Sequence, residues 1–478
     1  MKIALINFEE EGGYLPLATA YIAGYLREKG FENIKIIDRV NILNEIKNYK
    51  PDLIGVGLYS ATYFQANKLA EKIKKISNAP LIAGGPHVYC NPAHIKESNF
   101  DVGVVGEGEE TFHELANLYQ EKSKFSDKDL KKIQGLVFTD KKNKLNFTPS
   151  RELIKDLDKI PPPAIDLLKL KEHYLIPGPA GAHIVGIRGY IVTSRGCPYN
   201  CIYCSSKTIW PQVRWHSAER TVAEIKTWVK KYGATHIYIY DDLMIANRPR
   251  LRKIISLLRK EGLLGKVDFE ILGRANLIDE EMCKLLQEMN ASSVAIGFET
   301  GSERLLKYLK GGTVTIEQGE KAIKLLKKYK IKITGLFMVG SPTETEEDLK
   351  KTFKMASNPD IELAHVSFSV PFPDTQFWEY AINNKIFPKD FYEAGTYLTQ
   401  DSVNFDYLLT KEISLEKFKQ YWFKFMGLVK EKEKKYSPKF TLGQLKLLFS
   451  WRLFKKILKR KRHLHRHIGF ALNRLLKI

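Results

Sequence analysis

The sequence contains few cysteines, no long apolar run and no leader-like start, and each absence excludes a class of protein. Five cysteines in 478 residues do not make the disulfide framework of a secreted protein. No uninterrupted stretch of about 18 apolar residues occurs, which argues against a membrane-spanning helix. The opening residues, MKIALINFEE, contain acidic side chains and lack the apolar core of a signal peptide. We therefore expect a soluble chain in a reducing, cytoplasmic compartment.

Acidic residues are missing from one segment, the tail at 434–478. It holds 14 Lys and Arg and no Asp or Glu, so the rest of the chain carries only +7 of the net charge of +21. Trp451, Phe454 and Leu458 fall on one helical side and basic residues on another. Such a basic amphipathic helix favours peripheral binding to an anionic membrane surface, here the inner face. Packing on the protein's own core is the second interpretation, and nucleic acid is the least favoured partner.

The first 120 residues alternate short apolar runs with helical stretches. Strands are expected at 2–8, 34–38, 52–58, 80–85 and 100–106, with helices at 15–30 and 63–77. This alternation predicts an α/β fold with a doubly wound parallel sheet, in which ligands bind beyond the carboxyl ends of the strands. Gly84, Gly85 and Gly106 at those ends suit the close approach of a large ligand, although each is also an ordinary turn glycine.

A polar region separates this half from a second set of strand–helix repeats. It contains a predicted hairpin at 136–148 and the sequence KIPPPAID, whose successive prolines indicate a stiff linker. Six further strands alternate with helices, fewer than the eight repeats of a closed barrel, so a partial (β/α)6 barrel is expected. The expected domains are a Rossmann-type front domain at 1–125, a hairpin and linker at 126–184, the barrel at 185–400 and a C-terminal helical region with the basic tail at 401–478.

Three of the five cysteines, Cys197, Cys201 and Cys204, lie in the stretch TSRGCPYNCIYC after the first barrel strand. Structural zinc sites usually take four Cys or His ligands, and Cys90 and Cys283 are each isolated elsewhere in the chain. An iron–sulfur cluster of four irons held by three cysteines keeps one iron open for a substrate or cofactor. The spacing therefore favours a cluster over a zinc site.

The CxxxCxxC spacing, with an aromatic residue before the third cysteine, resembles the radical S-adenosylmethionine (SAM) superfamily. The resemblance covers residues 185–375. It implies that a [4Fe-4S] cluster binds SAM and, with an electron from a ferredoxin- or flavodoxin-type donor, cleaves it to a 5′-deoxyadenosyl radical. The implied SAM contacts are Tyr203, Asp241 or Asp242, Arg274, Glu299 and Gly340. For each aspartate alone, helix capping is the alternative interpretation.

The order of sheet domain and barrel is similar to the cobalamin-binding class of this superfamily. The resemblance implies a corrinoid near Gly84, Gly85, His87, Gly106 and Glu107. The Asp-x-His-x-x-Gly signature of a histidine lower ligand is absent, since the chain reads DRVNIL after the second strand. His87 alternatively caps a loop, and a front domain without cofactor is the alternative for the whole segment.

These patterns predict an enzyme that abstracts hydrogen from an unactivated carbon and then adds a methyl group carried by cobalamin. The small-molecule substrate is expected to be apolar and lipid-like, because of the tail. The first alternative is a radical SAM cyclase, C–C coupling or rearrangement enzyme with a vestigial front domain. The second is a lipid- or RNA-binding protein with a structural metal site.

Overall fold

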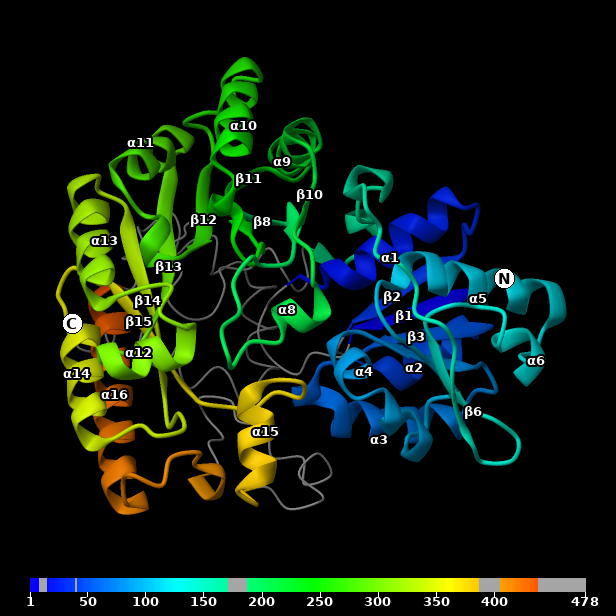
Figure 1. The fold of residues 1–478 in the computed structure, drawn as a ribbon. Helices are drawn as coiled ribbons and strands as arrows, with labels where there is room; N and C mark the ends of the chain where they lie inside the picture. Colours follow the sequence, from blue (N-terminus) through cyan, green and yellow to red (C-terminus); the bar gives the residue numbers. More distant parts are fainter. Residues whose placement is uncertain (8–14, 39–40, 171–186, 387–404, 437–478) are drawn as a thin grey trace, which may run out of the picture. The chain divides into compact units, whose positions relative to one another are not determined.

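The computed structural model describes residues 1–7, 15–38, 41–170, 187–386 and 405–436 (Figure 1). Its first sheet has seven strands in the order β2-β1-β3-β4-β5-β6-β7. They are β1 (Ile3–Asn7), β2 (Ile34–Asp38), β3 (Leu53–Gly57), β4 (Leu81–Gly84), β5 (Val102–Val104), β6 (Leu136–Thr139) and β7 (Leu145–Phe147). Strands β1 to β5 are parallel, and the β6–β7 hairpin joins β5 in antiparallel orientation. The predicted hairpin is confirmed, and it extends the front sheet.

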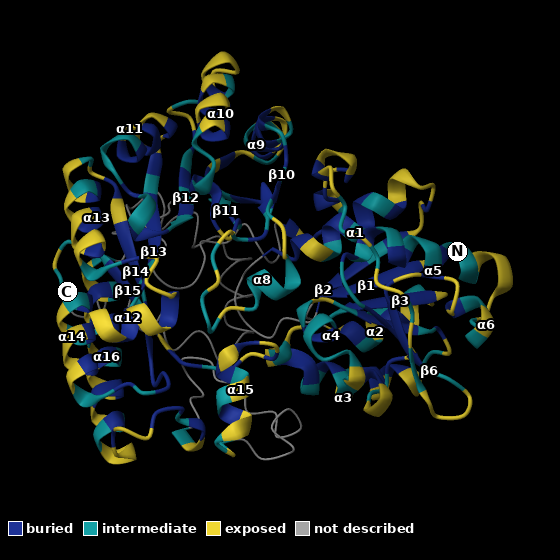
Figure 2. Cartoon of the chain, viewed as in Figure 1, coloured by how far each residue is buried: buried dark blue, intermediate teal, exposed yellow. Residues whose placement is uncertain are grey.

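Helices cover both faces of this sheet because successive strand residues point to opposite sides. Leu5 belongs to the core that includes α1 and α5, whereas Ala4 and Ile6 belong to the core that includes α2 and α3. The helices are α1 (Leu17–Glu28), α2 (Ile42–Tyr49), α3 (Tyr63–Lys74), α4 (Pro86–Cys90), α5 (Gly108–Lys122) and α6 (Asp127–Leu130). Figure 2 shows the strands as the buried layer. The doubly wound sheet predicted from the sequence is confirmed.

The proline-rich segment packs on α1 and is not a free linker. Ala164 donates its backbone N–H to the carbonyl of Ala20 over 2.9 Å, and both residues are buried. A Cβ atom on Gly24 would lie 2.3 Å from the carbonyl oxygen of Pro162, so only glycine permits this approach. The stiff prolines thus hold this stretch of chain against the front domain.

The second sheet has six parallel strands in the order β15-β14-β13-β12-β11-β8, each beside its neighbour in the sequence. They are β8 (Ile187–Ile191), β11 (Ala234–Ile239), β12 (Asp268–Gly273), β13 (Ala291–Glu299), β14 (Lys332–Val339) and β15 (Leu363–Phe368). The intervening helices are α9 (Ala218–Tyr232), α10 (Arg248–Lys260), α11 (Glu280–Met289), α12 (Glu303–Lys310), α13 (Ile316–Lys328) and α14 (Glu346–Ala356). This is the open partial barrel that the sequence predicts.

Short elements complete the part of the chain that the structure describes. They are the β9 (Ser194–Arg195) and β10 (Arg214–Trp215) ribbon, α8 (Ser206–Ile209), α15 (Gln376–Asn383) and α16 (Leu415–Tyr436), which packs beside β15. No helix among the described residues is long and apolar enough to cross a membrane. The described chain forms one compact unit up to Tyr436. The basic tail and its predicted membrane contact lie outside the described residues.

Candidate functional site

The cysteine loop, residues 197–204, follows the first barrel strand and lies between β9 and α8. The backbone N–H of Cys204 donates to the carbonyl of Cys201 over 3.1 Å, which closes a turn between them. The N–H of Ser206 donates to the sulfur of Cys204 at 3.4 Å. The sequence therefore places these thiols in a loop at the carboxyl end of a barrel strand, where ligands bind in such folds.

Burial raises the pKa of Cys197 and raises that of Cys204 to about 11, and the negative charges nearby add to the effect. Those charges include Cys201 and Asp242, so all three cysteines lie within electrostatic reach of one another. Thiolates are the form that binds metal, so loading this loop releases protons.

The described residues contain no group of three His, Cys, Asp or Glu side chains arranged to hold a single metal ion. A zinc ion needs sulfur ligands that converge to about 2.3 Å from one point. A four-iron cluster instead takes each cysteine at a different iron, so its ligands stand farther apart. The ligand role of the three cysteines stays a prediction.

Arg274 follows the end of β12 and lies beside Cys201. Its Nη1 donates to the sulfur of Cys201 at 3.4 Å and its Nη2 donates to the hydroxyl of Thr313 at 2.6 Å. The guanidinium lies 3.9 Å from the centre of the Tyr199 ring. The third nitrogen, Nε, is buried and has no hydrogen-bond partner among the described residues. An unpaired buried cationic donor beside a predicted cluster ligand fits the carboxylate or ribose oxygens of SAM.

Tyr203, Glu299 and Lys310 form a second group next to Cys201. Burial raises the pKa of Tyr203 well above its usual value, and the charges of Glu299 and Cys201 raise it further. Lys310 is buried, and its Nζ lies 3.0 Å from Oε1 of Glu299. Glu299 has a φ of 65°, a left-handed conformation that costs a non-glycine residue about 1–3 kcal/mol. The structure therefore brings Glu299 close to Tyr203 of the cysteine loop, and both residues are predicted from the sequence.

The two aspartates after β11 have different surroundings. Asp241 is buried, and its carboxylate accepts hydrogen bonds from the backbone N–H groups of Thr193 and Ser194, at 2.5 and 3.0 Å, and from the hydroxyl of Thr193. Asp242 is exposed, and its Oδ2 accepts from the hydroxyl of Ser206 at 2.5 Å. The structure gives Asp241 a role in holding the chain before the cysteine loop, which leaves Asp242 as the stronger candidate for the SAM amino group.

Gly340 follows β14 with a φ of 83°, which favours glycine. A Cβ atom there would lie 3.1 to 3.3 Å from side-chain atoms of Leu408, Phe418 and Phe368. Its backbone N–H donates to the carboxylate of Glu344 at 2.5 Å. The need for glycine is thus explained by its conformation and by packing against α16 and β15, and contact with the adenine of SAM stays a prediction.

Glycines at the carboxyl edge of the front sheet leave space for a ligand. Among the described residues, Cβ atoms added to Gly57 or Gly106 would meet nothing within 4 Å, and one on Gly84 would come no closer than 3.8 Å to a neighbour. Gly85 differs, because a Cβ there would lie 2.8 Å from the carbonyl oxygen of Leu58. The open side of three glycines fits a large ligand at this edge, whereas Gly85 serves the packing of β4 against the chain after β3.

His87 lies inside the front domain and not at an open edge. It is 1% exposed, its Nδ1 lies 3.0 Å from the hydroxyl of Ser60, and its Nε2 lies 3.2 Å from Nδ1 of His94. Its ring stacks on Tyr63 with centroids 4.2 Å apart. Burial, followed by the charge of His94, lowers the pKa of His87 to about 3. A neutral, packed imidazole favours the structural interpretation of His87.

Glu107 pairs with arginines on either side of the cysteine loop. Its Oε1 pairs with Nη1 of Arg195, and its Oε2 lies 2.8 Å from Nη1 of Arg214. Glu109, at the start of α5, pairs with Nη2 of Arg195 at 2.5 Å. Burial alone would raise the pKa of Glu109, but the guanidinium of Arg195 outweighs it and the pKa is lowered. Because its oxygens are occupied by these cations, Glu107 is not a free contact for a corrinoid in this structure.

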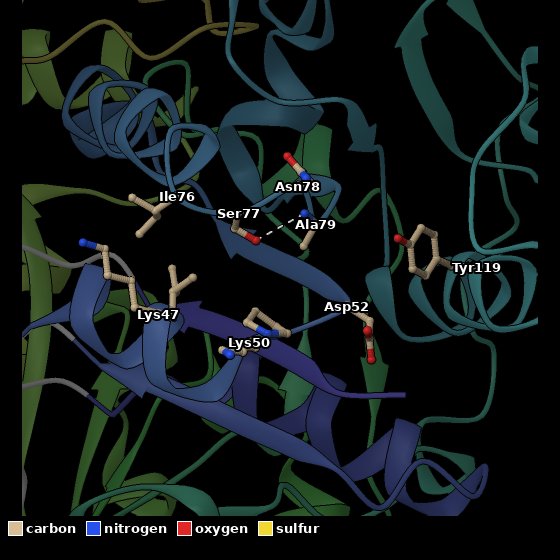
Figure 3. Close-up of a pocket in the computed structure, with 10 residues that line it drawn as sticks. Lys47, Lys50, Asp52, Ile76, Ser77, Asn78, Ala79 and Tyr119 are labelled. Carbon is tan, nitrogen blue, oxygen red and sulfur yellow. Dashed lines mark hydrogen bonds between the residues drawn. The ribbon is translucent and has the colours of Figure 1, made fainter.

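A cavity of about 410 Å³ lies at the opposite, amino end of the front strands. Figure 3 shows Lys47, Lys50, Asp52, Asn78 and Tyr119 among the residues around it. Ligands of parallel sheets bind at the carboxyl ends, and none of the residues predicted for a site lines this cavity. We therefore place the functional site at the cysteine loop and the facing edge of the front sheet.

Comparison with known proteins identifies the family. The radical SAM superfamily model matches residues 191–356, and the B12 binding domain model matches residues 3–116. An uncharacterized methyltransferase of Pyrococcus horikoshii is 33% identical over 383 residues, which are 78% of this chain and 79% of that protein. The chain belongs to the radical SAM superfamily. Its front domain is a B12 binding domain, so the enzyme class and the cofactors predicted from the sequence, a [4Fe-4S] cluster, SAM and cobalamin, are confirmed.

Other relatives show how far this radical SAM architecture extends. The anaerobic magnesium-protoporphyrin IX monomethyl ester cyclase of Rubrivivax gelatinosus is 27% identical, over 78% of this chain and 67% of its own. Among solved structures, the radical SAM methyltransferase TsrM of Kitasatospora setae, with cobalamin and a [4Fe-4S] cluster bound, matches 80% of this chain and 76% of its own. The TM-score of that match is 0.64 and the identity is 19%. That likeness shows the shared fold.

When bound, the cluster would supply the electron that cleaves SAM, and cobalamin would supply a carrier for a methyl group. The chain's own residues hold the loop and present donors: Asp241 anchors the chain before it, and Arg274 presents an unpaired Nε next to Cys201. Sequence reasoning missed Glu109, Arg195, Arg214, Lys310 and Thr313. Each looks like an ordinary surface residue until the partner that the fold brings to it is known.

Proposed function

We propose that the protein is a cobalamin-dependent radical SAM methyltransferase that methylates an unactivated carbon of an apolar small molecule. The observation that carries the proposal is the pairing of Glu107 with Arg195. Glu107 follows Gly106 at the carboxyl edge of the B12 binding domain, and Arg195 stands two residues before Cys197. A methyl carrier and a radical generator can act on one substrate only when their binding edges adjoin, and this pair supports such an arrangement.

Two further observations support the choice of methyl transfer and an apolar substrate. The Pyrococcus horikoshii relative is itself named a methyltransferase. In the barrel, a Cβ atom on Gly189 would lie 2.8 Å from the Trp228 ring of α9, so Tyr190 points to the other, inner side of β8. Tyr190 and Tyr240 stack with centroids 5.7 Å apart, and Tyr238 meets Tyr240 edge-on at 4.8 Å. An aromatic wall of this kind suits an apolar substrate body.

The proposed partners follow from the same chemistry. Reductive cleavage of SAM needs a low-potential electron donor, for which we propose a ferredoxin or flavodoxin. The basic tail supports peripheral binding to an anionic membrane, where lipid-like substrates reside.

A second candidate is a radical SAM cyclase or other C–C bond-forming enzyme that does not transfer a methyl group. The observation that favours it is the similarity to the anaerobic cyclase of Rubrivivax gelatinosus. The two candidates differ in what becomes of SAM. Methylation consumes SAM both as methyl donor and as radical source, so it yields S-adenosylhomocysteine and 5′-deoxyadenosine, whereas the second candidate yields 5′-deoxyadenosine without S-adenosylhomocysteine.

The experiment uses the full chain, purified and reconstituted without oxygen, with SAM that carries a deuterated methyl group and a lipid extract as substrate source. We expect about four irons and one cobalt per chain, both SAM products, and labelled methyl in the organic phase. Cys201→Ala should lose most of the iron and all SAM cleavage, and the control Cys90→Ala should keep both. Deoxyadenosine alone, with no label in the organic phase, would favour the second candidate.

A further inference from the structure

Four buried charges join the B12 binding domain to the barrel. Glu107 and Glu109 come from the start of α5, and Arg195 and Arg214 come from the β9–β10 ribbon. The glutamate side chains are 2 and 5% exposed and the arginine side chains 11 and 7%. Two negative and two positive charges make the cluster neutral as a whole, which is the condition for burying ions without a large penalty.

Three of the four side chains, those of Glu107, Arg195 and Arg214, have further contacts outside the cluster. The backbone N–H of Ile154 donates to Glu107 at 2.6 Å, and Arg214 donates to the carbonyl of Ile154 at 2.7 Å. The guanidinium carbons of Arg195 and Arg214 lie 5.6 and 5.4 Å from the centre of the Trp210 ring. Both arginines therefore have their orientation set by two kinds of contact, an ion pair and an aromatic ring.

The positions of these residues along the chain connect two cofactor sites. Glu107 follows the open Gly106 at the edge of the front sheet, and Arg195 precedes Cys197 by two residues. Trp210 and Arg214 follow α8, directly after the cysteine loop. The loop that would hold the cluster is thus flanked by Arg195 and Arg214, and both arginines pair with glutamates at the start of α5 in the B12 binding domain.

A buried ion pair is weak evidence for stability, because the loss of hydration offsets much of the attraction. What such a cluster supplies is orientation, since its charges are matched in only one arrangement of the two elements. If corrinoid binding moves the start of α5, Arg195 and Arg214 must therefore move with it. If cluster binding moves the cysteine loop, Glu107 and Glu109 must move with it. Binding linkage requires that any such effect be reciprocal.

We propose that Glu107, Glu109, Arg195 and Arg214 are positioning residues that couple corrinoid binding in the front domain to cluster binding in the cysteine loop. The coupling rests on the proposed function in one respect, that the corrinoid and the cluster act together on one substrate. Its chemistry is electrostatic and involves no covalent step. A protein with the cluster in place binds corrinoid with a different affinity from a protein without it.

The test titrates hydroxocobalamin, followed by its absorbance, into two forms of the full chain: the cluster-loaded protein and a cluster-free Cys197→Ala, Cys201→Ala, Cys204→Ala variant. We expect the two dissociation constants to differ at least about fivefold. Glu109→Gln should make the two dissociation constants nearly equal. The matched control is Glu110→Gln, because Glu110 is the next residue of the same helix turn but pairs with Arg151 at the surface.

A conservative second variant guards against misfolding. Arg214→Lys keeps the positive charge but has a shorter side chain, and it lacks the planar guanidinium that lies over the Trp210 ring. It should retain full iron and lose the coupling. In the unaltered protein, corrinoid should change the electron paramagnetic resonance spectrum of the reduced cluster. In Arg214→Lys, this change should be absent.

The outcomes separate the two proposals. The coupling alone is overturned if corrinoid binds with equal dissociation constants to the cluster-loaded and cluster-free forms of the unaltered protein. It is also overturned if the two constants still differ in both Glu109→Gln and Arg214→Lys. A protein that binds no corrinoid in either form overturns the proposed function and the coupling with it.

Discussion

Replacing Asp241 distinguishes a structural carboxylate from a SAM ligand. The carboxylate is buried and accepts from the N–H groups of Thr193 and Ser194 and from the hydroxyl of Thr193. Burial raises its pKa, and the hydrogen bonds from Thr193 and Ser194 work against that rise. Burial therefore works against the charged form of this carboxyl, and a neutral amide of the same shape keeps an oxygen for both N–H groups.

Asp241→Ala should be strongly destabilising. It leaves two buried backbone N–H groups without an acceptor, and each costs about 1–3 kcal/mol, so we expect a loss of about 2–6 kcal/mol. Asp241→Asn keeps an oxygen for both N–H groups, and the hydroxyl of Thr193 can turn to accept from the new amide. We expect the asparagine variant to lie within about 1 kcal/mol of the unaltered protein.

The assay is urea unfolding of the cluster-free protein, with iron content and SAM affinity measured after reconstitution. Asp241→Asn should keep its iron and its SAM affinity. The matched control is Asp242→Asn, which should leave stability unchanged and weaken SAM binding if Asp242 receives the amino group. The reasoning is wrong if Asp241→Asn unfolds as readily as Asp241→Ala, or if it keeps its stability and loses SAM binding.

Two further predictions concern a buried acid and the tail. Burial raises the pKa of Glu344 to about 8, so the folded state holds its proton over a range in which the unfolded state has lost it. Its contribution to stability is complete below about pH 4.5 and is lost as pH rises through about 8. Glu344→Gln should match the unaltered protein in urea at pH 5 and exceed it at pH 9, and equal differences at both pH values would contradict this. Truncation after Tyr436, where the compact unit ends, should leave SAM cleavage intact and abolish flotation with anionic vesicles, an attraction worth about 1 kcal/mol per cation near the surface. Unchanged flotation would rule out the membrane role of the tail, and loss of the cluster would make the tail part of the core.

Most of the architecture could be predicted because it depends on short-range patterns. A buried strand such as 34–38 is recognisable from its own apolar residues, and the structure reproduces those bounds as β2. Gly30, the last residue of the helix expected at 15–30, lies two positions after the end of α1 and has a φ of 91°. The cysteine motif is equally local, since its three thiols lie within a stretch of eight consecutive residues.

The roles of single polar residues could not be predicted in this way. Asp241 and Asp242 are adjacent and chemically identical in the sequence, yet one carboxylate accepts hydrogen bonds from chain 47 and 48 positions earlier and the other is exposed. Gly340 resembles a ligand-contacting glycine until α16 is seen to fill the space beside it. Neither distinction can be predicted from the residue itself or from the residues next to it in the sequence.

The sequence by itself determined the alternation of strands and helices, the cysteine spacing and the charge of the tail, because each depends on residues a few positions apart. The tertiary structure alone decided which charges meet: Glu107 and Arg195, 88 positions apart, are paired and buried between two domains. An isolated carboxylate or guanidinium is stable only in water, so its burial depends on a partner that the fold must bring to it. That partner is set by the packing of whole domains, which no local pattern encodes.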